Sequence, residues 1–409
     1  MSAFALEWLH LLARWIHVLA AILWVGDSFL FMWMDRSLVP PSRPREGAVT
    51  GELWLVHSGG FYEVVKRRFL APAELPPTLH WFKWEAYTTW ITGIFLLGLI
   101  YYLGHGVYLV DPQVSRIGYG AAVALSLGLL VVGWLVYDGL WRSPLARRPA
   151  VAALTSLALL TATAYGLTRV YSGRAAYLEL GAMMGTLMAA NVWRVIIPAQ
   201  SAMLAATRAG RPVDTAPGER AKRRSTHNHY MTLPVLFTML SNHFPITYGH
   251  PLNWLVLVLI AIVGASLKYT MNFRARSNPW LVLAGVAALG AVVFLTAPRA
   301  PGAALAPGAG SGPPVRFAEV RDILDRRCLT CHSARPSNPA FPQPPAGVVL
   351  TDPRRVRALA PRILERAVIT KTMPLGNLTG MTDEERATLG RWIGQGARLE
   401  PPAPDSLPR

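Results

Sequence analysis

Both cysteines of the chain, Cys328 and Cys331, belong to the sequence Cys-Leu-Thr-Cys-His, in which His332 directly follows the second thiol. Two thiols at this spacing can add across the two vinyl groups of one haem, and the adjacent imidazole can then bind the iron. A redox disulfide is the alternative interpretation, and the adjacent histidine disfavours it. The motif therefore predicts covalent attachment of one haem c. Because such attachment takes place outside the cytoplasm, residue 328 must lie beyond a membrane.

The residues on either side of the motif have the pattern of a small helical domain. Val320, Ile323 and Leu324 form an apolar stripe, which predicts a short helix leading into the cysteines. Thr382 is followed three residues later by Glu385, and this pair predicts a capping box at the start of the last helix.

The order of these elements resembles a single-haem cytochrome c domain over residues 316–409. In that family a methionine, usually followed by proline, binds the iron from the loop before the last helix. Met373, which precedes Pro374, fits this pattern, whereas Met381 lies beside the helix cap and is interpreted as a packing residue. The resemblance implies that His332 and Met373 are the iron ligands. A thioether ligand raises the potential of a haem, which suits a domain that receives electrons.

The rest of the chain has the composition of a membrane protein, because 52% of all residues are apolar, 15% are charged and 14 are Trp. A membrane-spanning helix needs roughly 20 apolar residues. Eight segments meet this need: 5–34, 85–104, 118–141, 150–170, 176–197, 229–248, 252–270 and 279–297. The first has no basic residue before it and no cleavage site after it, so it is expected to stay in the mature protein.

Basic residues alternate between the linkers that join these segments. The odd-numbered linkers hold nineteen Lys and Arg, with Lys268 counted after the seventh segment, and the even-numbered linkers hold three. Since positive residues collect on the cytoplasmic side, both termini and the haem motif are placed outside. The net charge of +17 therefore reflects membrane orientation, and nucleic acid is not expected as a partner.

We therefore expect an all-α fold, with a polytopic eight-helix transmembrane bundle followed by a small α-helical cytochrome c domain. The bundle covers residues 1–297 and the haem domain residues 316–409. Residues 298–315 between them are rich in Pro, Gly and Ala and lack periodicity, which is typical of a linker.

Polar residues inside spans are costly and are candidates for function. His10, Arg14 and His17 lie at positions i, i+4 and i+7, so they share one face of the first helix. Asn242 and His243 lie at a similar depth in the sixth segment. Such a cluster can bind an anion and transfer protons. The alternative for each histidine is a hydrogen bond between helices.

A second set of histidines lies on the cytoplasmic side, at His57, His80 and His227. His57 precedes two glycines that permit close backbone approach, and His80 lies among aromatic residues at a membrane boundary. An aromatic belt with positive-inside charge also explains these segments. A substrate site here would need a relay across an apolar layer about 30 Å thick, such as a haem b held by intramembrane histidines.

Five segments of the chain resemble the bacterial membrane-integral urate oxidase (urate hydroxylase) family. They are WIHVLAA from Trp15, HSGGFY from His57, HWFKWE from His80, NVWR from Asn191 and LSNHFP from Leu240. That family has eight spans and a cytochrome c domain, so the similarity covers essentially the whole chain. The family often has Asn where this chain has His229, and no obligatory role is expected for His229.

The resemblance implies oxidation of urate to 5-hydroxyisourate with water as the oxygen source, in purine catabolism. Electrons would leave through haem c to a terminal cytochrome oxidase or a soluble cytochrome c, in the bacterial inner membrane with both termini periplasmic. We assign Arg14 to binding of the urate anion, His17 and His243 to acid–base steps and Asn242 to hydrogen bonding. The competing hypotheses are a membrane-tethered electron carrier and a redox-gated transporter.

Overall fold

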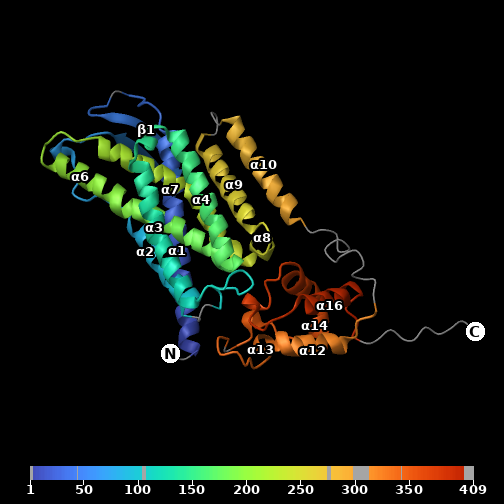
Figure 1. The fold of residues 1–409 in the computed structure, drawn as a ribbon. Helices are drawn as coiled ribbons and strands as arrows, with labels where there is room; N and C mark the ends of the chain where they lie inside the picture. The colour runs from blue at the N-terminus through green and yellow to red at the C-terminus, as the bar shows by residue number, and fades with distance from the viewer. Residues whose placement is uncertain are drawn as a thin grey trace, which may run out of the picture.

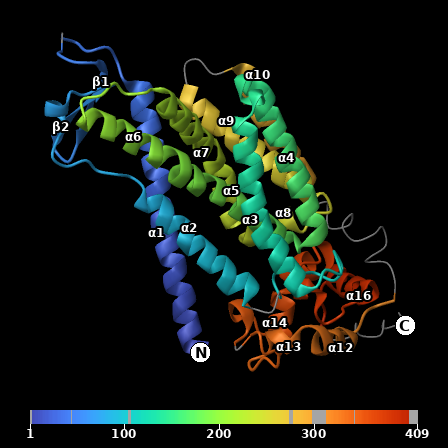
Figure 2. The same cartoon turned by 60° about the vertical axis from the view of Figure 1, so that its left-hand side comes forward.

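The computed structural model describes residues 3–43, 45–103, 107–273, 278–297, 313–341 and 343–399. These residues form a helical bundle and a smaller helical module (Figure 1). Most of the expected linker, residues 298–312, lies outside the described residues. In both views the first residues of helix α1 and the module lie at the same end of the bundle (Figure 2).

Helices occupy all eight segments that were expected to span the membrane. Their bounds are α1 Ala3–Ser37, α2 Trp84–Leu97, α3 Tyr119–Arg142, α4 Pro149–Val170, α5 Gly173–Asn191, α6 Ile197–Arg208, α7 Ala216–Leu240, α8 Pro245–Tyr248, α9 Asn253–Phe273 and α10 Pro279–Thr296. A π-helical segment, Gly98–Tyr102, continues α2, and another, Val192–Ile196, joins α5 to α6.

Six of the described helices are long and apolar enough to cross a membrane. They are Phe4–Ser37, Tyr119–Arg142, Pro149–Val170, Gly173–Arg208, Asn253–Phe273 and Pro279–Thr296. The expected count of eight is therefore supported only in part, because α2 is short and the first half of α7 is strongly charged. Large apolar side chains are exposed around the bundle, including Trp15 at 61%, Val131 at 60% and Phe294 at 82%. Such a surface is compatible with contact to lipid.

Helix α5 forms the centre of the bundle and packs against α3, α4 and α7. Its buried face combines large residues such as Tyr177 and Leu180 with small ones. A Cβ atom on Gly181 would lie only 2.0 Å from Thr238 Oγ1 of α7, so a glycine is required for these two helices to approach this closely.

The expectation of an all-α fold is wrong for one segment on the side of the bundle away from the module. Strands β1 (Val49–His57) and β2 (Gly60–Arg67) form an antiparallel hairpin. Ser58 and Gly59 connect them with φ angles of 51° and 75°, a two-residue turn whose twist suits a hairpin. The glycines after His57 therefore make a tight turn, and the Val-rich flanking segments supply the strands.

One charge was assigned to the wrong place. Lys268 was counted in the linker after the seventh span, but it lies inside α9 and is only 1% exposed. Arg274 and Arg276, the other two residues of that count, lie outside the described residues.

The module contains helices α12 (Phe317–Arg327), α13 (Leu329–His332), α14 (Pro353–Ala358), α15 (Ala360–Ile363) and α16 (Asp383–Gly394). The helices expected before the cysteines and at the end of the domain are thus confirmed, and Thr382 and Glu385 form the expected capping box. The apolar core gathers around Val320, Leu324, Leu389 and Trp392, all at most 1% exposed.

Candidate functional site

Helix α12 delivers the two thiols to one side of the module. Cys328 lies at its C-terminal end, and the single turn of α13 then carries Cys331 and His332. Both cysteines are free. Burial, with a smaller contribution from the neighbouring Cys331, raises the pKa of the Cys328 thiol to about 12. At neutral pH this thiol is therefore protonated and poorly suited to disulfide exchange.

The imidazole of His332 is held by the backbone of the module. Its Nδ1–H donates to the carbonyl of Val348 at 3.0 Å, which fixes the tautomer and leaves Nε2 able to bind a metal. Among the described residues, no group of three or more His, Cys, Asp and Glu side chains is arranged to hold a metal ion. A haem, which needs only axial ligands and two thiols from the protein, fits this donor set.

The two candidate methionines have different environments. Met381 is 2% exposed and belongs to the apolar core of the module, as expected for a packing residue. Met373 is half-buried in the loop before α16, where its amide donates to the carbonyl of Arg366 at 2.9 Å. The assignment of Met373 as an iron ligand stays a prediction.

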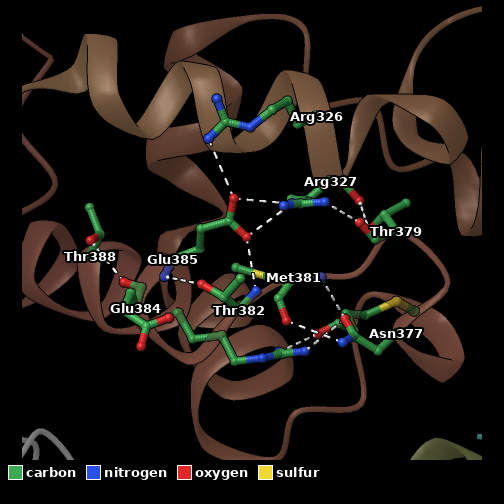
Figure 3. A network of polar contacts seen from close by, with 11 residues as sticks. Arg326, Arg327, Asn377, Thr379, Met381, Thr382, Glu384, Glu385 and Thr388 are labelled. Carbon is green, nitrogen blue, oxygen red and sulfur yellow. Dashed lines mark hydrogen bonds and ion pairs between the residues drawn. The ribbon is translucent and has the colours of Figure 1, made fainter. Parts of the chain in front are cut away.

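A polar network joins the cysteine segment to the methionine loop (Figure 3). Arg327, next to Cys328, donates to both carboxylate oxygens of Glu385 at 3.1 and 2.9 Å. Arg327 also donates to the carbonyl of Thr379, whose hydroxyl donates back to the Arg327 carbonyl at 2.9 Å. Burial raises the pKa of Glu385, but hydrogen bonds from Thr382 and Arg327 outweigh it, so the pKa is lowered.

Arg386 of α16 connects the loop that contains Met373 to the rest of the module. Its guanidinium is 2% exposed and donates to three acceptors, the carbonyls of Ala367 and Met373 and the side chain of Asn377. The Met373 contact measures 2.7 Å. The position of the Met373 backbone thus depends on a buried arginine of α16.

In the bundle, His17 joins two helices. Its Nδ1–H donates to the carbonyl of Thr89 on α2 at 3.0 Å, and Thr92 Oγ1 lies at the same distance. The ring packs on Gly93, where an added Cβ would lie 3.0 Å from His17 Cε1. This is the interhelical hydrogen bond that was considered as the alternative to a catalytic role. A catalytic role of His17 stays a prediction.

Asn242 contacts a basic residue that was not expected at this site. Its Oδ1 accepts from Arg174 Nε of α5 at 2.8 Å. His243 follows at the end of the same turn and is exposed. The structure therefore joins Asn242 to Arg174, a residue that was counted only as a linker charge.

Tyr108 links this site to the module. The Arg174 guanidinium stacks over its ring, 4.7 Å from the centroid. Burial raises the pKa of the Tyr108 hydroxyl, and the Cys331 thiol raises it as well. The positive charges of Arg174 and Arg14 lower the same pKa. All three groups therefore lie within electrostatic range of Tyr108. On the module side, Phe341 meets the Tyr108 ring edge-to-face, with 6.2 Å between centroids.

Two further contacts fix the module on the bundle. A Cβ atom on Gly376 of the module would lie 3.1 Å from the carbonyl of Val110, in the segment after Tyr108. A Cβ atom on Gly249, which follows α8, would lie 2.8 Å from Thr370 Cβ of the module. Both glycines permit close approach of the two parts, so the module is held against the bundle at the segment that contains Tyr108.

A buried carboxylate that was not expected from the sequence lies in the centre of the bundle. Glu179 of α5 is fully buried, and its Oε2 accepts from Ser126 Oγ of α3 at 2.6 Å. The Ser126 hydroxyl is in turn 2.5 Å from the hydroxyl of Tyr102. A glutamate within an apolar span was the available signal. For Arg174, the signal was its place among only three basic residues of the even-numbered linkers.

The three histidines that were expected on the cytoplasmic side do not form a common site in the described structure. His57 ends β1, and His80 packs against Phe82, which contacts α1. His227 of α7 bonds to the Tyr137 hydroxyl at 2.8 Å and packs on Trp141 with 4.0 Å between centroids.

Comparison with known proteins gives one result for this chain. The family model described as "Urate oxidase N-terminal" matches residues 3–297, which is the whole helical bundle. No curated protein and no solved structure matches the chain.

Proposed function

Because the chain belongs to the urate oxidase N-terminal family, we propose that it is a membrane-bound urate oxidase of the dehydrogenase type. In this proposal it converts urate to 5-hydroxyisourate with water as the oxygen source. The electrons pass to a haem c in the same chain and then to a terminal oxidase or a soluble cytochrome c. The family match supports a urate-related oxidoreductase, and the residues of the module support the electron route.

The position of Tyr108 is the observation that carries the proposal. The Arg174 guanidinium lies 4.7 Å from the centroid of its ring, and Phe341 of the module meets the same ring with 6.2 Å between centroids. A substrate bound at Arg174 would therefore lie close to the module that carries Cys328 and Cys331. The proposal places the urate site at this end of the bundle, so electrons need not cross the apolar layer and no haem b is required.

The residues at this site suit an anionic purine. Urate is a monoanion at neutral pH, and guanidinium groups together with an aromatic ring can bind its charge and its flat ring. Arg174 Nε is held by Asn242, which fixes the direction of its remaining N–H groups. Arg14 is exposed on α1 and adds positive charge to the same region.

The reaction consumes urate and one water and yields 5-hydroxyisourate, two electrons and two protons. A bond forms between the water oxygen and C5 of the purine, and the protons need acceptors near the ring. His243, which is exposed beside Asn242, and His17, through Nε2, are the proposed acceptors. General base catalysis by histidine near neutral pH is a common role of this side chain.

The haem would be attached to Cys328 and Cys331, with His332 Nε2 and Met373 as iron ligands, and it supplies one-electron transfer. We further propose eight spans, with α2 and the second half of α7 completing the six apolar ones. The basic linkers then lie in the cytoplasm and the module in the periplasm, in the bacterial inner membrane.

The first experiment is an optical titration of the full chain, purified in detergent, oxidised and free of oxygen. Addition of urate is expected to produce the bands of reduced haem c, with no b-type band. A flat trace, in a sample whose haem is still reduced by dithionite, would refute direct transfer from urate and favour a carrier or a transporter.

Arg174→Gln tests the site itself. Loss of a charged hydrogen-bond donor costs about 1.5–3 kcal/mol, so the KM for urate should rise about 10- to 100-fold while reduction by dithionite is unchanged. Arg169→Gln is the matched control, because Arg169 also stacks on a tyrosine, 4.9 Å from the Tyr165 centroid, but belongs to the end of α4. Equal effects of the two variants would contradict the proposed site.

A further inference from the structure

A cavity of about 720 Å³ opens at the far end of the bundle from the haem module. The cavity lies where α3 ends. Helix α3 starts just after the segment that contacts the module and is 24 residues long, so its end is far from the module. The end of α3, the α5–α6 junction and the start of α7 form its walls. Six of its lining residues are arginines: Arg142, Arg147, Arg194, Arg220, Arg223 and Arg224.

The positive charge of this cavity is only partly compensated. Asp138 of α3 pairs with Arg142 at 2.8 Å and with Arg224 at 2.7 Å. Within the described part of the chain, none of the remaining four arginines of the cavity has an ion pair with a carboxylate. The cavity therefore presents an excess of guanidinium groups to an anionic ligand.

Arg224 provides a second, independent indication of a ligand. Its side chain is 4% exposed, and its guanidinium lies 4.6 Å from the centroid of the Tyr137 ring. Nη2 donates to Asp138, but Nη1 is buried and has no hydrogen-bond partner. A buried guanidinium N–H without an acceptor is costly. An oxygen of a ligand in the cavity would supply that acceptor.

The charge of the cavity favours an anion with several acceptor oxygens, such as phosphate. Six arginines line the cavity, and arginine binds phosphate through paired hydrogen bonds. One wall is apolar, formed by Val195, Pro198, Ala199 and Ala202. We propose that this cavity binds the phosphate headgroup of an anionic phospholipid, from the leaflet opposite the haem module. Basic pockets between membrane helices bind such headgroups.

Lipid titration of the full chain, followed by native mass spectrometry, tests the proposal. Binding of phosphatidylglycerol is expected, with much weaker binding of phosphatidylcholine of the same chain length. The double variant Arg220→Gln/Arg223→Gln should weaken phosphatidylglycerol binding by about fivefold for each arginine. Arg208→Gln/Arg211→Gln is the matched control, because these two arginines lie nearby along the chain but outside the cavity.

Three outcomes would overturn the assignment. The first is equal binding of both lipids, or equal loss in the two double variants. The second is specific binding of inorganic phosphate at millimolar concentration without displacement of any lipid. This result would identify a site for free phosphate. The third is displacement of the lipid by urate at concentrations near its KM, which would make the cavity a substrate site.

Discussion

Replacement of Arg386 by leucine should loosen the loop that contains Met373 in the module for which we propose a haem. The guanidinium is 2% exposed and donates to the carbonyls of Ala367 and Met373 and to Asn377. Arg386→Leu removes the described side-chain donor of the Ala367 and Met373 carbonyls, while Asn377 Oδ1 still accepts from the Met381 amide at 2.9 Å. Removing one partner of such a buried charged network costs about 3–5 kcal/mol. That loss is a large part of the roughly 5–15 kcal/mol that stabilises a domain.

Urea unfolding of the full chain, followed through haem absorption, measures this effect. With a slope of about 1.5 kcal/mol per molar urea, the midpoint should fall by about 2–3 M. The far-red band that reports a bond between iron and methionine sulfur should disappear at lower urea than the main transition, because the Met373 carbonyl has lost its donor.

Arg391→Leu is the control on the same helix. Arg391 donates a single described hydrogen bond, to Thr388 Oγ1 at 3.1 Å, so its loss should cost less than about 1 kcal/mol. A midpoint for Arg386→Leu within about 0.5 M of the parent protein, or equal shifts in both variants, would refute the role assigned to this network.

Two further predictions concern the same module. Met373→Ala should abolish the far-red band and lower the haem potential, whereas Met381→Ala should keep the band and cost about 2–5 kcal/mol of stability; the reverse pattern would make Met381 the ligand. The folded-state pKa of Glu385 is lowered, so its contribution to stability is present above the unfolded pKa of about 4.3 and is lost as pH falls through the folded value. In Glu385→Gln the urea midpoint should therefore fall less steeply with pH, below about 4.3, than in the parent protein. Identical dependence of the midpoint on pH in the two proteins would contradict the assignment.

Local patterns in the sequence were sufficient for the positions of the helices. Haem attachment at Cys328, Cys331 and His332 rests on a contiguous motif and stays a prediction. The capping box of Thr382 and Glu385 is also local, and it forms as predicted. Apolar segments likewise mark the bundle helices, although they do not distinguish α2 and α7 clearly from helices that are merely buried.

Features that depend on packing between distant segments could not be predicted in this way. The contact between Arg174 and Asn242 joins residues 68 positions apart, and only the packing of α5 on the turn after α7 brings them together. Lys268 shows the same limit, because its charge suggested a linker while packing buries it inside α9. The hairpin at Ser58 was missed because the glycines after His57 were interpreted as permitting close backbone approach and not as a turn between two strands.

The contacts of the module with the bundle have a consequence for kinetics. A cytochrome that moved freely on its linker would have to alternate between the substrate site and the acceptor, and the two would compete for one surface. Here Phe341 and Gly376 hold one side of the module against the bundle at Tyr108 and Val110. An external acceptor must therefore approach another side. Steady-state rates should then show independent saturation by urate and by acceptor, without inhibition of one by an excess of the other.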